Sequence, residues 1–216
     1  MKKLILPFIL TFGLITSICI PSTADAAWQA QAKGKTYSEA MIQLKYDMQE
    51  LWIEHAWWTR SYIVSSLAGL DDQQPVLNRL LKNQVDIGNA IKPYYGEEAG
   101  NKLTALLREH ILIAGKIVEA AKKGDQANLA NFNKEWYRNA DEIVAFLSSA
   151  NPNWSKKDLT DMFYKHLKLT TDEVISRLKK DWEADIQTAD LNEEHLIHMS
   201  DFLTDGIIKQ FPKKFK

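Results

Sequence analysis

The sequence contains few residues that break, bend or cross-link a chain. Its 216 residues include nine glycines, six prolines and a single cysteine, Cys19. One cysteine excludes a disulfide framework, and no phosphate-binding loop, dinucleotide fingerprint or Gly-x-Ser-x-Gly motif is present. Strict alternation of apolar and polar residues, which marks strands, is missing over any useful length. These absences favour an all-α fold and argue against nucleotide-dependent or serine-hydrolase chemistry.

Residues 1–26 have the pattern of a secretory signal peptide. A short basic start precedes the apolar run Leu4–Ile20, and Ala24 and Ala26 occupy the −3 and −1 positions of a cleavage site. A membrane anchor is the alternative interpretation, but the run is near the lower limit of roughly 17–25 residues for a span. We therefore expect a secreted, extracytoplasmic protein that begins at Ala27. It then contains no cysteine, because Cys19 leaves with the signal.

The remaining chain is close to neutral. Without Lys2, Lys3 and Asp25 it holds 25 basic and 27 acidic residues, so it lacks the basic face that a nucleic-acid partner requires. No second apolar run approaches membrane length, and we do not expect an integral membrane protein after signal cleavage. The basic tail 213–216 has two interpretations. It contacts an anionic wall polymer or envelope lipid, or, as is commoner, it is a frayed and solvated end.

An eight-residue pattern occurs three times, at intervals of 55 and 56 residues. In each copy, apolar residues three and four apart lead to a histidine, which is the pattern of one helix face. The copies are Met48–His55, Leu103–His110 and Leu159–His166. A repeat of this size marks a supersecondary unit. We expect three pseudo-repeated helical hairpins. Near-threefold stacking of the hairpins would bring the three histidines together, whereas a linear solenoid would spread them out.

The breakers divide the chain into six expected helices, which end near Gly69, Lys92, Gly124, Ser149, Leu178 and Pro212. Ser38 and Ser155 are good N-caps for the first and fifth of them. The expected organisation is a signal peptide at 1–26, a flexible lead at 27–36, a single helical-bundle domain at 37–212 and the basic tail. About 190 residues suffice for one core without cross-links.

The second helix of each pair also carries a common pattern, an amide or imidazole followed three residues later by an acid. The copies are Asn83 with Asp86, Asn139 with Glu142, and His198 with Asp201. Residues three apart share a helix face, so we expect these side chains to meet the repeated histidines in one polar layer. The candidate metal ligands are His55, His110, His166, Asp86, Glu142, His198 and Asp201.

Imidazoles and carboxylates on facing helices form the metal sites of helical bundles, and this donor set suits zinc, iron or manganese. The alternative is that each histidine pairs with a carboxylate to fix helix register and binds nothing. His195, on the same helix as His198, is a further imidazole. Trp57 and Trp58 are adjacent and cannot both face one core, so one of them is at least partly exposed.

Several segments together resemble a family of small exported proteins of Bacillus-like bacteria, and the resemblance covers nearly the whole mature chain. They are Leu51–His55 with Thr59 and Arg60, Lys92–Gly96, Trp136–Tyr137 with Asn139–Glu142, and Gly206–Pro212. Labels of glycosyltransferase and acetylglutamate kinase attach to that family, but these residues offer no site for a sugar nucleotide or ATP. The Glu-His pair followed by Thr-Arg is also similar, distantly, to hemerythrin-like and ferritin-like bundles.

The sequence therefore favours an exported helical-bundle protein that binds a metal ion or small ligand in a His/carboxylate core. The competing hypothesis is a non-catalytic structural or interaction protein of the cell envelope or spore surface. An enzyme such as a di-metal oxidase ranks third.

Overall fold

Long stretches without glycine or proline form long helices, and the capping residues set their ends. The structure is a computed structural model that describes residues 37–216; the expected signal peptide (1–26) and lead (27–36) lie outside the described residues. Helix α2 (Glu39–Ala68) begins where the Ser38 hydroxyl accepts the Met41 N–H at 3.3 Å, and it ends at Gly69, whose φ of 69° is left-handed. Ser155 caps α5 in the same way.

The other elements are α3 (Gln73–Lys123), α4 (Gln126–Ala150), α5 (Lys156–Leu178), α6 (Trp182–Gln210) and the short 3₁₀ helix η1 (Pro212–Phe215). Residues 37–216 thus form five α-helices and no strand, which confirms the all-α prediction. Six α-helices were expected. The second and third of them are joined in α3.

The joint in α3 lies at Gly96, at the expected breaker. Its φ of 87° and ψ of 171° are non-helical, a conformation that only glycine adopts readily. The segment after Gly96 folds back along the segment before it, and Arg108 Nη1 donates to the Leu81 carbonyl at 3.3 Å between the two. The two segments also approach closely at Gly88 and Gly100. A Cβ added to Gly88 would lie 2.6 Å from the Gly100 carbonyl oxygen.

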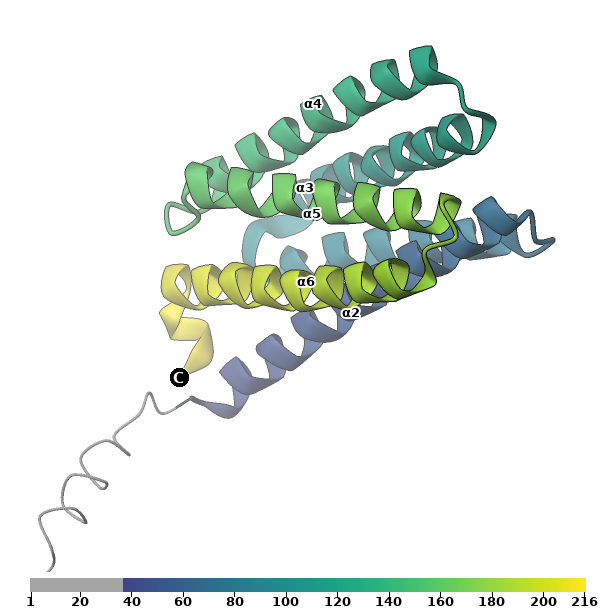
Figure 1. Cartoon of the computed structure of the whole chain (residues 1–216). Coiled ribbons are helices and arrows are strands. Elements are labelled where there is room, and N and C mark those ends of the chain that lie inside the picture. Colours follow the sequence, from purple (N-terminus) through teal and green to yellow (C-terminus); the bar gives the residue numbers. More distant parts are fainter. Residues whose placement is uncertain (1–36) are drawn as a thin grey trace, which may run out of the picture. The chain divides into compact units, whose positions relative to one another are not determined.

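Each helix packs on the next, and α6 returns to pack on α2, so the helices close a ring around a shared core (Figure 1). Gln49 on α2 donates to Asp201 on α6 at 2.7 Å across this closure. The core includes apolar residues of all three repeats, and Trp52, Trp136 and Trp154 are among its buried side chains. Within residues 37–216, no helix combines the length and apolarity needed to cross a bilayer.

The C-terminal tail differs from the expected frayed and solvated end. Its residues form η1, and the Phe215 ring is buried, stacked on Tyr94 with 5.7 Å between ring centroids. Lys214 Nζ donates to the Pro93 carbonyl at 3.0 Å. The reason is hydrophobic: Phe215 covers the end of the core beside the α3 turn, and this outweighs the basic character of its neighbours.

Candidate functional site

The three repeated histidines come together in the core. His55 lies on α2, His110 on α3 and His166 on α5, and each is only 2–3% exposed. The His166 ring centroid lies 5.5 Å from that of His55 and 6.2 Å from that of His110. His166 is therefore the middle ring of a set that we call the imidazole row.

Each imidazole bonds to an amide side chain of the helix segment that follows it. His110 Nδ1 lies 2.8 Å from Asn139 Oδ1, and His166 Nδ1 lies 2.9 Å from Asn192 Oδ1. The amide oxygens accept here, because the amide nitrogens already donate elsewhere; Asn139 Nδ2, for example, donates to the Leu106 carbonyl at 3.1 Å. Two of the histidines therefore carry their proton on Nδ1, with the lone pair on Nε2.

In the unit of His55, Asn83 makes the same main-chain contact as Asn139 does in the unit of His110, but a different residue contacts the imidazole. Asn83 Nδ2 donates to the Leu51 carbonyl at 2.9 Å, and Leu51 precedes His55 by four residues, as Leu106 precedes His110. The amide on His55 Nδ1 is the neighbouring Gln84, at 3.2 Å. In all three units, an amide thus ties the second segment to the first at the level of the histidine.

The imidazole row is uncharged. Burial, the largest cause, and neighbouring imidazoles lower the pKa of His55 and of His166 to about 3. Burial likewise lowers the pKa of His110 to about 4, although its hydrogen bond to Asn139 acts in the opposite direction. At neutral pH, the layer is therefore held by neutral hydrogen bonds.

The carboxylates expected in this layer lie elsewhere. Asp86 pairs with Lys82, Glu142 with Arg138, and Asp201 with Lys45, all with partly or largely exposed side chains. The expected His–carboxylate pairing is therefore wrong, and His–amide pairing replaces it. A residue three positions on is rotated by about 300°, roughly 60° short of a full turn. When the asparagine faces the core, its acid thus sits on the helix flank, where water lowers the cost of its charge.

The remaining predicted imidazoles are also outside the row. His198 is exposed, and His195 Nε2 lies 2.8 Å from the Met162 carbonyl. Within residues 37–216, no group of three or more His, Cys, Asp or Glu side chains is arranged to hold a metal ion. Sequence reasoning missed Gln84 and Asn192. The available signal was an amide 26 to 29 residues after each repeated histidine.

A second polar cluster lies further along α2, α5 and α6. Arg60 Nη1 donates to Glu173 Oε1 at 2.7 Å, and the same guanidinium forms two 3.1 Å bonds to Asp185. Arg177 also bonds to Asp185, at 2.8 Å. Both carboxylates are only 1% exposed. Burial raises the pKa of Glu173 to about 7, against the opposing effect of Arg60.

A pocket of about 180 Å³ opens beside this cluster, and we call it the Glu173 pocket. Its walls come from α2, α5 and α6: Ala56, Trp57, Arg60, Glu173, Ile186, Ala189, Asp190, Asn192 and Glu193. Asn192 belongs to both sites, because its side chain lines the pocket and accepts from His166. The pocket is therefore the surface end of a polar seam that reaches the imidazole row.

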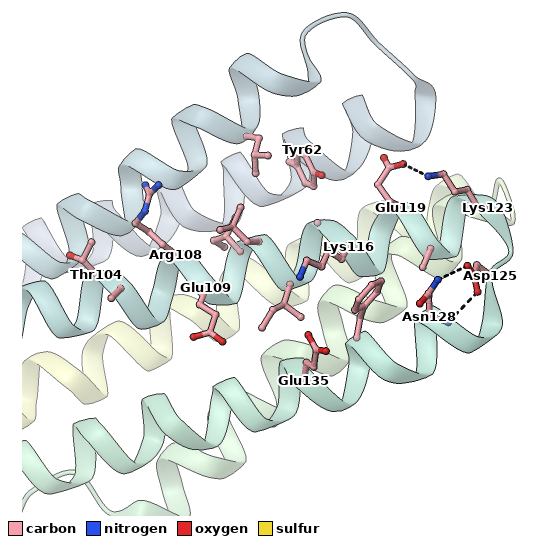
Figure 2. A pocket seen from close by; sticks show the side chains of 18 of the residues that line it. Tyr62, Thr104, Arg108, Glu109, Lys116, Glu119, Lys123, Asp125, Asn128 and Glu135 are labelled. Atoms are coloured by element: carbon pink, nitrogen blue, oxygen red, sulfur yellow. Dashed lines mark hydrogen bonds and ion pairs between the residues drawn. The ribbon is translucent and has the colours of Figure 1, made fainter.

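A larger concavity is an open groove of about 1020 Å³ along the second segment of α3 (Figure 2). Tyr62 lies on one side of it and the α4 residues Asn128 and Glu135 on the other. Several of its polar groups bond to one another, including Glu119 with Lys123 and Asn128 with Asp125. Size alone favours the groove as the binding site. The buried carboxylates and the raised pKa of Glu173 favour the Glu173 pocket instead.

Comparison with known proteins returns no match: no family model, no curated protein and no solved structure is significantly similar to this chain. The function is therefore inferred from the geometry of these sites.

Proposed function

We propose that this protein is a non-catalytic binding protein that takes a small solute in the Glu173 pocket. The observation that carries the proposal is a nearly fully buried carboxylate in the wall of a surface pocket. Arg60 bonds to Oε1 of Glu173, and no other hydrogen bond to this carboxylate occurs within residues 37–216. Oε2 is not among the fully buried polar atoms that lack a partner, so it is open to the pocket and is available to a ligand that supplies a donor or a positive charge.

The pocket is suited to holding a solute rather than transforming it. No histidine lines it, and the imidazoles behind it have their Nδ1 atoms engaged by amides. The arginine is held by two carboxylates and does not swing freely. A volume of about 180 Å³ is below the roughly 300–1,000 Å³ of sites for drug-sized molecules. The occupant is accordingly a small solute and not a polymer.

Filling the pocket tests this proposal. Ala189→Phe places a ring in the cavity, and Ala145→Phe, at an exposed alanine of α4, is the matched control. The probes are tetramethylammonium, acetate and neopentyl alcohol, with binding measured by thermal shift and calorimetry. We expect at least one probe to bind the wild type and the control variant but not Ala189→Phe. The proposal fails if none binds, or if Ala189→Phe binds as well as the wild type.

Metal binding at the imidazole row is a second candidate, favoured by three neutral imidazoles in one layer. Histidine ligands commonly donate their second N–H to a fixed acceptor, as His110 and His166 do. Six buried side-chain polar atoms of residues 37–216 have no hydrogen-bond partner. Three of them belong to residues that contact the row, Trp52 Nε1, Gln84 Oε1 and Trp136 Nε1, and such atoms call for a bound species. Ligation at about 2.0–2.1 Å would require the rings to turn toward one another.

Elemental analysis separates the two candidates. A zinc, iron or manganese protein would retain about one ion per chain through purification, lose it in His166→Ala and keep it in the exposed His198→Ala. A metal-free wild type that gains no stability from added Zn²⁺, Fe²⁺ or Mn²⁺ would remove this candidate and leave the row as a structural clasp.

We also propose a repeat organisation and an exported location for this protein. The chain consists of three copies of one helical hairpin, supported by the shared asparagine-to-carbonyl bonds of Asn83 and Asn139. The protein is exported, supported by the signal pattern at 1–26, and intact mass of secreted material starting at Ala27 tests this point.

A further inference from the structure

We infer that the Glu173 pocket selects a small organic cation, a substituted ammonium, through Trp57 and a surplus of carboxylates. This inference rests on the proposed function and adds the chemical class of the ligand.

The charges around the pocket are unbalanced. In the adjoining cluster, Arg60 and Arg177 face Glu173 and Asp185, so two cations meet two carboxylates. Asp190 and Glu193 add two more carboxylates at the rim. Neither rim residue forms an ion pair with another described side chain; the ion pairs of residues 37–216 on α6 involve Asp185 and Asp201. The pocket therefore has an excess of negative charge and favours a cation.

The pocket offers little to an anion. Arg60 is the only basic residue in its wall, and both of its Nη atoms donate to carboxylates, Nη1 to Glu173 and Nη2 to Asp185. An anion would have to displace one of these bonds and would then meet the rim carboxylates. Such repulsion of an anion adds to the specificity that attraction gives for a cation.

An aromatic wall completes the site. Trp57 is 61% exposed although it lines the pocket, and an indole face attracts organic cations more than other aromatic rings do. Ala56, Ile186 and Ala189 provide apolar surface for the alkyl groups of a substituted ammonium. The positive charge of such a ligand suits Glu173 Oε2, the carboxylate oxygen left open by Arg60. Aromatic face, alkyl contact and carboxylate together are the recognition elements of ammonium binding.

The experiment compares tetramethylammonium with neopentyl alcohol, a neutral molecule of similar shape, and with acetate, by calorimetry on the folded chain at pH 8. We expect tetramethylammonium to bind, and the other two probes to bind at least tenfold more weakly. Trp57→Leu should weaken binding about tenfold, and Asp190→Asn combined with Glu193→Gln should also weaken it. The control Tyr46→Leu, at an exposed aromatic residue of α2 outside the pocket wall, and Glu194→Gln should leave it unchanged.

The outcomes separate this inference from the proposed function. If neopentyl alcohol or acetate binds as tightly as tetramethylammonium, and Ala189→Phe abolishes that binding, the pocket is a solute site and the cation inference is wrong. Equal weakening by Trp57→Leu and Tyr46→Leu also overturns it. If no probe binds the wild type, the proposed function and the inference both fail.

Discussion

Acid should unfold this protein through its imidazole row. In the unfolded chain a histidine titrates near its ordinary pKa of 6.5, whereas burial holds His55, His110 and His166 at about 3 to 4. Between pH 4 and pH 6.5, these histidines bind protons in the unfolded state but remain neutral in the folded state. The contribution of the row to stability is therefore complete above pH 6.5 and decreases as the pH falls toward 4.

The size of the effect follows from the number of rings. Each histidine that stays neutral in the folded state lowers the free energy of unfolding by about 1.4 kcal/mol per pH unit once the pH is well below 6.5. From pH 7 to 4.5, the three together cost about 7 kcal/mol. This is comparable with the whole free energy of unfolding of a typical domain, about 5–15 kcal/mol.

Glu173 acts in the opposite direction. Its folded pKa of about 7 lies above its unfolded value of 4.5, so its contribution is fully present below pH 4.5 and is lost as the pH rises through 7. As the pH falls from 7 to 4.5, protonation of Glu173 therefore raises the free energy of unfolding by about 2.5 kcal/mol. The net loss from pH 7 to 4.5 is then about 5 kcal/mol, equivalent to an uptake of about two protons on unfolding near pH 5.5.

Urea denaturation at half-unit steps from pH 7.5 to 4.5 measures this slope directly. We expect His110→Leu to reduce the proton uptake by about one, while His198→Gln, an exposed histidine, leaves it unchanged. Glu173→Gln should instead make the acid-side slope steeper, because the opposing proton is removed. Stability that is constant between pH 6.5 and 5, or imidazole NMR signals of the row that titrate near 6.5, would refute the reasoning.

Three further outcomes follow from the packing. Asn139→Leu should lower the free energy of unfolding by about 1–3 kcal/mol, because it leaves the His110 Nδ1–H buried without an acceptor. In a double-mutant cycle, the variant that also carries His110→Leu should lose less stability than the two single variants added together. Gly88→Ala should lower the melting temperature sharply, since its Cβ would lie 2.0 Å from Thr104 Oγ1 and overpacking of this kind costs at least about 1–3 kcal/mol; an unchanged melt would show that the α3 segments move apart freely. Phe215→Ala should cost about 2 kcal/mol of apolar burial in chemical denaturation, and no loss would mean that the tail does not cover the core.

The sequence predicted the helices and the meeting of the histidines from strong local signals. Caps such as Ser38 and Ser155 fix helix ends through bonds to residues only three positions away, so a single sequence reveals them. The spacing of 55 and 56 residues then placed the three imidazoles at one level, and their centroids do lie 5.5 and 6.2 Å apart.

The partners of the histidines were not predictable in the same way. Asn192 lies 26 residues after His166, whereas Asn139 lies 29 after His110, so the third copy is out of register with the other two. The acids near these positions appeared to be stronger partners, but desolvation of a carboxylate disfavours that choice in a buried layer. The Glu173 cluster joins residues more than 110 positions apart in the sequence, and no local pattern marks such a contact.

The close approach of Gly88 and Gly100 also has a consequence for the order of folding. These residues are separated by only twelve positions, so the chain between them closes on a timescale of roughly 10–100 ns, and little loop entropy opposes their contact. The α2–α6 closure, by contrast, joins Gln49 to Asp201 across 152 positions. We expect the α3 turn to nucleate folding from the middle of the chain outward, with docking of α6 as the late step that limits the rate.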